Sequence, residues 1–177
     1  VDPSGTIVWQ FRNHRPTVLA NSKLANGSFK ERDDAGMPVN WRIMSRVAEG
    51  GGTVSWEEDD RGKSYPVLEF DRSGAVALYQ LVQVTPGRRY RIAAELSTGD
   101  MSEGSFACLQ LAYRDEYGGW FEDVFDSPKG NLMEGDTDWN EDVLEVVAPE
   151  GAKTVEVRVL LVGPGRAHVR RVMMISA

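Results

Sequence analysis

The chain has 177 residues, 41% of them hydrophobic, which is enough for one well-buried domain and short for two. Its net charge of −7 disfavours general nucleic-acid binding, which uses a basic face. No apolar run approaches the roughly 18–20 residues that span a bilayer, no signal-peptide pattern opens the chain, and a single cysteine excludes an internal disulfide.

Residues 1–19 read apart from the rest of the chain. Residues 7–11 have the composition of a strand. Residues 12–16, which end in Pro16, would end that strand. We interpret this block as a leader arm or the remnant of a preceding domain. The main domain is expected to span residues 20–177.

The main domain is expected to be all-β. Its segments are short, rich in β-formers and divided by turn residues, and no window of eleven or more residues keeps a helical period. We expect strands at 40–48, 52–58, 66–71, 75–84, 88–98, 105–114, 120–125, 142–148, 153–162 and 167–176. Short strands at this spacing predict a two-sheet antiparallel β-sandwich.

Several of these strands have one apolar face. Between 90 and 96 the even-numbered residues are apolar, and between 109 and 113 the odd-numbered ones are. Val155, Val157, Val159 and Leu161 likewise share one parity, with Glu156 and Arg158 on the other face, and a Gly-Pro-Gly turn at 163–165 leads into the last strand. Cys108, set among apolar neighbours, is expected to be a small buried side chain and not a reactive thiol.

Four segments carry a resemblance to a known family. They are Asn26–Phe29 with 36–41, Tyr79–Tyr90, Trp139 with 147–152, and Gly165–Val172. In this order, across residues 22–176, they resemble carbohydrate-binding modules of the galactose-binding-like jelly-roll type, the group found beside xylanases and cellulases. The resemblance implies a non-catalytic module that targets a larger secreted bacterial enzyme to a polysaccharide. Its partners would be that glycan and a neighbouring catalytic domain, in an extracellular or periplasmic location, with neither nucleic acid nor membrane.

The sequence departs from this family where the family holds a structural calcium. The family usually has an acidic residue after the phenylalanine of the first strand and an Asp-Asp or Asp-Asn pair in the last strand. Here the matching positions are Lys30, with Glu31 as the alternative register, and Arg170-Arg171. A cationic side chain removes an oxygen ligand and repels the ion. We therefore predict that the chain uses no cofactor and lacks this calcium.

The strongest candidate for ligand binding is a hairpin at 113–122 with Gly118-Gly119 at its turn. Tyr117 and Trp120 lie near its tip, and exposed loop aromatics are typical of sugar-binding sites. The alternative is that Trp120 folds back and covers an open end of the sandwich. The acidic stretch 134–142 lacks the ligand spacing of a calcium loop, so no metal is assigned to it.

A second aromatic pair, Trp56 and Tyr65, flanks an acidic connection at 57–63 and is a further ligand-binding candidate. Because Trp56 shares parity with Val54, burial in the core is the competing interpretation. The family pattern implies packing roles, in the core or its lid, for Trp41 and Trp139.

The polar strand faces offer Arg91, Gln110, Arg114 and Arg158, with Glu95 and Glu156. If they line one groove, as the family's concave face implies, its arginines favour an acidic polysaccharide such as a uronate or a sulfated glycan. The alternative is that the same residues form cross-strand ion pairs.

Catalysis is poorly supported. The chain has two histidines and no nucleophile elbow, phosphate loop or zinc-protease motif. Two other functions remain open: a structural or interaction β-sandwich that packs against a neighbouring domain through residues 1–19, and a jelly-roll polysaccharide lyase, although the lyase signatures Arg-x-Glu-x-Arg and Gln-x-His are missing.

Overall fold

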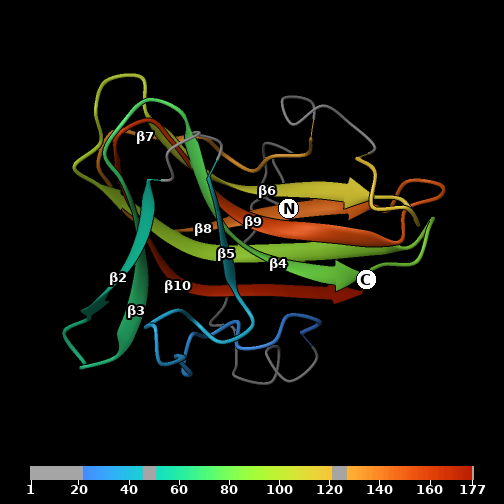
Figure 1. Cartoon of the computed structure of the whole chain (residues 1–177), viewed down its shortest axis with the longest axis horizontal. Helices are drawn as coiled ribbons and strands as arrows, with labels where there is room; N and C mark the ends of the chain where they lie inside the picture. Colours follow the sequence, from blue (N-terminus) through green and yellow to red (C-terminus); the bar gives the residue numbers. More distant parts are fainter. Residues whose placement is uncertain (1–21, 46–50, 121–126, 177) are drawn as a thin grey trace, which may run out of the picture.

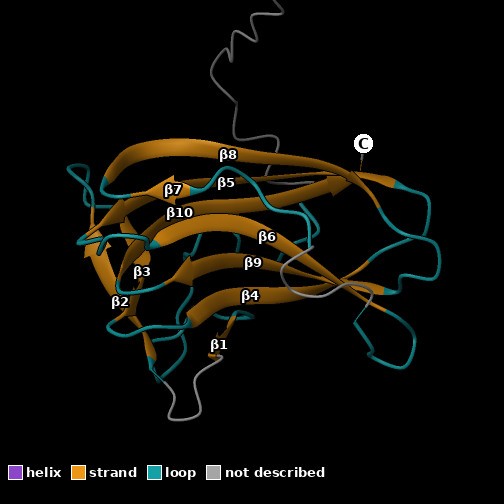
Figure 2. Ribbon diagram, turned by 90° about the horizontal axis from the view of Figure 1, so that it is seen from above, coloured by secondary structure: helices purple, strands orange, loops and turns teal. Residues whose placement is uncertain are grey.

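A computed structural model describes residues 22–45, 51–120 and 127–176. Within these ranges the chain forms ten strands in two five-stranded sheets, which stack face to face as two layers (Figure 2). The predicted all-β antiparallel sandwich of the jelly-roll type is therefore confirmed. None of the described residues forms a helix of the length and hydrophobicity needed to cross a membrane. The predicted leader, residues 1–19, lies outside the described ranges.

The strands follow one another along the chain as β1 (Arg42–Ser45), β2 (Gly52–Glu58), β3 (Ser64–Phe70), β4 (Ala75–Gln83), β5 (Arg89–Gly99), β6 (Phe106–Arg114), β7 (Met133–Glu134), β8 (Thr137–Val147), β9 (Thr154–Val162) and β10 (Gly165–Ser176).

The first sheet has the order β1-β4-β9-β6-β7 and the second has the order β2-β3-β10-β5-β8, with antiparallel neighbours throughout. The two last strands, β9 and β10, lie in opposite sheets, so the turn at Gly163 and Pro164 carries the chain across the sandwich. At one end, the β2–β3 hairpin stands steeply to the long strands (Figure 1).

The core fills the space between the two sheets with the alternate residues that the sequence pattern indicated. Tyr90, Ile92 and Leu96 of β5 are fully buried, as are the odd-numbered apolar residues 155–161 of β9. Burying one such side chain contributes about 1.5–3 kcal/mol to folding, so this inward-facing set is the main stabilising element of the sandwich. Trp41 is also buried, against Phe29, as expected.

Three strands begin earlier than expected. β3 starts at Ser64 and not at 66, β10 starts at Gly165 and not at 167, and β8 starts at Thr137 and not at 142. The sequence 137–141 is polar and lacks an apolar face, but its backbone pairs with β5, with Asn140 opposite Leu96 and Thr137 opposite Thr98. The pairing partner, not the hydrophobic pattern, makes this segment a strand. Of the strand expected at 120–125, only Trp120 is described, and it forms an isolated bridge with Arg114.

Candidate functional site

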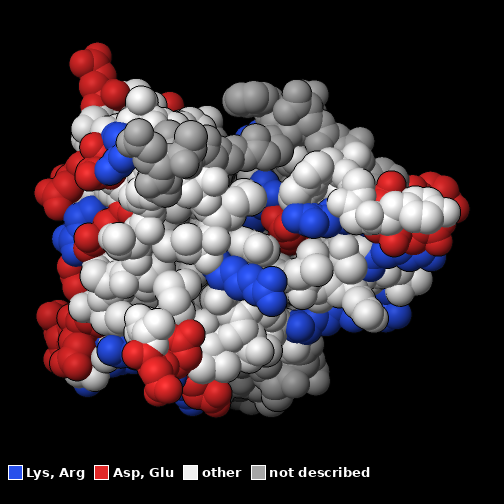
Figure 3. Space-filling model, viewed as in Figure 1, with Lys and Arg blue, Asp and Glu red and all other residues white. Residues whose placement is uncertain are grey.

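The outer face of the first sheet gathers most of the predicted polar residues. On this face the side chains of β4, β9 and β6 form cross-strand rows, because alternate residues of a strand point away from the core. One row runs from Tyr79 through Arg158 to Gln110, and the next runs from Leu81 through Glu156 to Ala112. Figure 3 looks onto this side of the molecule, where Lys and Arg side chains lie beside a small acidic area.

A buried ionic cluster lies at the centre of this face. The Arg158 guanidinium donates from Nε and Nη2 to Oε2 of Glu156, at 2.9 and 2.6 Å, and from Nη1 to Oε1 of Gln110 at 3.2 Å. Arg114 pairs with the other oxygen of Glu156. Arg158 is 0% exposed and Glu156 is 1% exposed. Two guanidiniums thus share the carboxylate of Glu156.

Trp120 covers this cluster from outside. Its ring centre lies 4.0 Å from the Arg114 guanidinium and 4.9 Å from that of Arg158, both within the range of a cation–π interaction. The Trp120 side chain remains 43% exposed. Trp120 therefore lies over the arginines of the sheet face and does not close an end of the sandwich, and it keeps aromatic surface available to a ligand.

The predicted hairpin turn is present between Arg114 and Trp120. Oδ1 of Asp115 accepts hydrogen bonds from the backbone N–H groups of Tyr117 and Gly119, at 2.9 and 2.7 Å, which fixes the turn. Tyr117 at its tip is 88% exposed. Both predicted aromatics are thus solvent-accessible, but only Trp120 lies against the sheet face.

A groove opens beside the ionic cluster on the same face. It encloses about 330 Å³, and its lining includes Arg42, Tyr79, Leu81, Arg114 and Glu156. Ligand pockets typically hold roughly 300–1,000 Å³. Arg42 lies opposite Tyr79 in the β1–β4 register and forms no ion pair with any described residue. The groove therefore joins an aromatic ring, an apolar side chain that is half exposed and an unpaired guanidinium.

The rim of the groove is held by Gln80. Its amide oxygen accepts from the backbone N–H of Ala25 at 2.8 Å, and its amide nitrogen donates to the carbonyls of Ala25 and Asn40, at 2.9 and 3.3 Å. Because Ala25 and Asn40 both line the groove, this single side chain fixes two of its loops to β4.

Three predicted ligand-binding residues lie elsewhere. Trp56 is half-buried and packs against the core, with Arg32 stacked 3.6 Å from its ring centre and its Nε1–H donating to the Gly36 carbonyl at 2.7 Å. Tyr65 lies on the outer face of the second sheet. Arg91 lies on that sheet as well and pairs with Glu145 at 3.2 Å. The structure therefore brings Gln110, Arg114, Arg158 and Trp120 together, but not these three.

The alternative interpretation, that the charged strand residues form ion pairs, also describes part of what is found. Arg114 pairs with Glu156 across strands, Arg91 pairs with Glu145 across strands, and Glu95 lies 3.6 Å from Arg170. The first pair lies in the groove, whereas the other two lie on the second sheet.

The second sheet carries a separate network around Tyr65. Its hydroxyl donates to Glu57 at 3.1 Å, and Arg166 donates to the other Glu57 oxygen at 2.5 Å. Burial raises the pKa of Glu57, but the hydrogen bond and charge of Arg166 outweigh it, and the net pKa is lowered. Burial, followed by the hydrogen bond to Glu57, raises the pKa of Tyr65. Nδ1 of His168 bonds to Ser97 Oγ at 3.1 Å, and burial lowers the pKa of His168.

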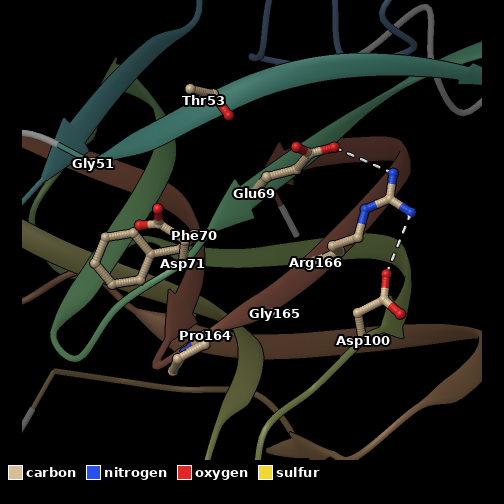
Figure 4. Close-up of a pocket in the computed structure, with 9 residues that line it drawn as sticks. All are labelled: Gly51, Thr53, Glu69, Phe70, Asp71, Asp100, Pro164, Gly165 and Arg166. Atoms are coloured by element: carbon tan, nitrogen blue, oxygen red, sulfur yellow. Dashed lines mark hydrogen bonds and ion pairs between the residues drawn. The ribbon is translucent and has the colours of Figure 1, made fainter.

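Arg166 also borders a hollow of about 370 Å³ between the sheet end and the loop at Asp100 (Figure 4). Its guanidinium lies 3.2 Å from Glu69 and 3.7 Å from Asp100, in addition to its bond to Glu57. Asp71, also on the lining, pairs with Arg72 at 2.8 Å. The charged groups here largely satisfy one another, so the groove on the first sheet is the better candidate.

Trp139 has a packing role, as the family pattern implied, but it does not lie in the core between the sheets. It lies half-buried on the outer face of the second sheet, with its ring centre 5.0 Å from that of Tyr65 and 3.9 Å from the Arg170 guanidinium. Trp139 faces outward because it lies on the same face of β8 as Glu141. In the β5–β8 register Glu141 lies opposite Glu95, which faces outward.

Cys108 is fully buried, as expected, and burial raises the pKa of its thiol to about 12. Because the thiolate is the reactive form, this side chain is inert at neutral pH.

No group of three or more His, Cys, Asp or Glu residues in the described ranges is placed to share a metal ion. At the positions that prompted the calcium prediction, Lys30 is exposed, Arg170 pairs with Asp59 and Glu95, and Arg171 pairs with Glu141. The prediction that calcium is absent awaits a binding experiment.

Sequence reasoning missed Arg42, Tyr79 and Leu81 as lining residues. Tyr79 and Leu81 share the outward parity of β4, a pattern that was available from the sequence. The approach of β1 that places Arg42 beside Tyr79 depends on sheet order, which the sequence does not display.

Neither a protein-family model nor a curated protein sequence matches the chain. Solved structures do share its fold. An enzymatically active domain of tailspike protein 4 from bacteriophage CBA120 is 20% identical with a TM-score of 0.68, over 89% of this chain and 22% of that one. The chain thus spans about a fifth of that tailspike structure.

Most of the similar structures are carbohydrate-binding modules. The C-terminal family 22 module of Clostridium thermocellum Xyn10B is 15% identical with a TM-score of 0.60, over 89% of this chain and 96% of that one. The module TmCBM61, solved with β-1,4-galactotriose, is 15% identical with a TM-score of 0.56, over 88% and 99%. The chain therefore has the jelly-roll fold of carbohydrate-binding modules.

Proposed function

We propose that the chain is a non-catalytic module that binds a polysaccharide in the groove on the outer face of the first sheet. The observation that carries the proposal is the placement of Tyr79 and Trp120 on one face with Arg42 and Arg114. Aromatic rings stack on the apolar faces of pyranoses, while guanidiniums take hydroxyl or acidic oxygens. The fold shared with carbohydrate-binding modules supports the same proposal.

The charge of the groove favours an acidic glycan. The described residues that line the groove include two guanidiniums, those of Arg42 and Arg114, and one carboxylate, that of Glu156, in a protein whose net charge is −7. A local positive excess on an acidic chain attracts carboxylate or sulfate groups, and the planar guanidinium of Arg42 matches them in a bidentate geometry. We therefore infer a uronate-containing or sulfated polysaccharide as the ligand.

A neighbouring catalytic domain in the same parent protein would explain the use of such a module. In the Clostridium thermocellum xylanase 10B structure solved with xylohexaose, a family 22 module and a catalytic module occur together. Tethering would raise the effective concentration of the enzyme at its extended substrate outside the cell.

Affinity electrophoresis tests the proposal with polygalacturonate, alginate and a sulfated galactan against neutral xylan and glucan. We expect an acidic polymer to retard the wild-type chain, and Tyr79→Ala and Arg42→Gln to abolish most of the retardation. Arg91→Gln is the matched control, since it removes the same charge from the opposite face. Retardation that survives in Tyr79→Ala and Arg42→Gln would overturn the assignment of the groove.

The non-catalytic role is tested by incubating the chain with the polymer that it binds. Neither new reducing ends nor the ultraviolet absorbance of unsaturated uronates should appear. Release of either product would establish an enzyme.

A further inference from the structure

The groove on the first sheet offers two neighbouring positions for sugar rings, one at Tyr79 and one at Leu81. These are alternate residues of β4 that both line the groove, so their side chains lie on the same face of the strand, about 7 Å apart along it. That spacing is close to the length of one pyranose residue. Tyr79 is half-buried, and Leu81 is 51% exposed. Two consecutive residues of a polysaccharide therefore fit over these two side chains.

The Tyr79 position has an available cation beside it. Arg42 lies directly opposite Tyr79 in the β1–β4 register, hence on the same face, and it is exposed. Its guanidinium forms no hydrogen bond or ion pair with any described residue. A carboxylate or sulfate on the sugar over Tyr79 therefore binds this guanidinium without displacing a described partner from it.

The Leu81 position differs because the charges next to it are already paired. In the β4–β9 register Leu81 lies directly opposite Glu156. The two oxygens of that carboxylate bind Arg114 and Arg158, and Arg114 is the second guanidinium of the groove lining. An acidic sugar residue at this position would lie on an apolar side chain, beside a carboxylate and without a free counter-charge among the described residues.

The Leu81 position instead has a group suited to hydroxyls. Asn40 lines the groove and is exposed, and its side-chain amide forms no hydrogen bond with a described residue. Gln80 donates to the Asn40 carbonyl at 3.3 Å, which keeps Asn40 at the edge of β4. An amide both donates and accepts hydrogen bonds, as sugar hydroxyls do. An apolar side chain under the ring and an amide at the rim together favour a neutral sugar.

We propose that the groove selects a polysaccharide in which an acidic residue is followed by a neutral one, with the acidic residue over Tyr79 and the neutral residue over Leu81. This inference rests on the proposed function and specifies the glycan further. A polymer made only of uronates fills the Tyr79 position equally well, but it places a second carboxylate at Leu81. Arg42 and Leu81 are thus the residues that set the specificity.

Isothermal titration with three hexasaccharides tests this proposal: galacturonate alternating with rhamnose, galacturonate alone, and xylohexaose. We expect the alternating oligosaccharide to bind about tenfold more tightly than oligogalacturonate, because it places no charge beside Glu156, and xylohexaose to bind most weakly. Arg42→Gln should remove most of the binding of both acidic oligosaccharides. Arg91→Gln, on the other sheet, should leave all three affinities unchanged.

Leu81→Lys should remove the preference for the alternating oligosaccharide. The Leu81 side chain is half exposed, so the substitution is compatible with folding, and an unchanged Tm checks this. The new cation supplies the counter-charge that the second position lacks. We expect oligogalacturonate to bind this variant at least as tightly as the alternating oligosaccharide does.

Two results would overturn the inference and leave the proposed function intact: wild-type protein that binds oligogalacturonate as tightly as the alternating oligosaccharide, or a preference that is unchanged in Leu81→Lys. If neither acidic oligosaccharide binds, the proposed function itself fails, and this inference fails with it. The two failures are therefore distinguishable.

Discussion

Replacing Glu156 by Gln should destabilise the protein severely although the two side chains have nearly the same shape. Arg158 is fully buried and bonds to Glu156 through two of its nitrogens, and Arg114 shares the same carboxylate. Removing one partner of a buried ion pair costs about 3–5 kcal/mol, because the remaining charge stays buried without its counter-charge. For a chain of this size that loss lowers Tm by roughly 6–20 °C, at about 2–4 °C per kcal/mol.

Urea unfolding followed by tryptophan fluorescence measures this loss, with Trp120 as a reporter beside the cluster. The matched control is Glu145→Gln, the same substitution in an ion pair whose carboxylate is 58% exposed, and it should cost at most about 1 kcal/mol. If Glu156→Gln costs no more than Glu145→Gln, the cluster does not stabilise the fold as argued.

Three further predictions concern stability. Asp142→Ala should cost about 1.5–3 kcal/mol in urea unfolding, because the buried carboxylate accepts bonds from the backbone of Leu109 and Asn131; a neutral effect would contradict this. Because burial lowers the pKa of His168 below its ordinary 6.5, the unfolded chain binds more protons, so stability should fall as pH drops below about 6.5. His168→Gln should flatten that dependence of Tm on pH, and an unchanged slope would refute it. Calcium or a chelator should leave Tm unchanged, whereas a rise with calcium would show that the ion is bound.

The strands could be predicted because a strand with one buried face alternates between apolar residues and other residues along the chain. The parity of Val155 to Leu161 identified the inward face of β9, and the structure confirms it. The same alternation placed Glu156 and Arg158 on the outward face, which is also correct, but outward does not mean exposed. Both side chains are buried although they face outward. Trp120 covers Arg158, and such a contact between residues far apart in the sequence leaves no trace in the local alternation of a strand.

The candidate site was predictable only in part, for a similar reason. Gln110, Arg114 and Arg158 were identified from their strands, and β6 and β9 turned out to be neighbours. Arg91 has the same pattern on β5, but β5 belongs to the other sheet. The sheet to which a strand belongs depends on pairing between strands that are far apart in the sequence. A single sequence shows which residues of a strand share a face, but it does not show the order of the strands in the sheets.

Trp139 shows how much a family pattern leaves open about a single residue. The resemblance implied a packing role in the core or its lid, and an outward parity on β8 places the ring on the outer face of the second sheet, over Arg170 and Tyr65. Its aromatic neighbours come from β3 and β10, which are distant in sequence and adjacent only in the folded sheet.

The most direct test of the central claim is a titration of the ¹⁵N-labelled 19.6-kDa chain with oligogalacturonate, followed by two-dimensional NMR. If the groove on the first sheet binds an acidic glycan, amide shifts should cluster at Arg42, Tyr79, Leu81 and Arg114, together with the Trp120 indole. Shifts confined to the second sheet, or none with oligogalacturonate, oligoalginate and a sulfated galactan alike, would contradict the account.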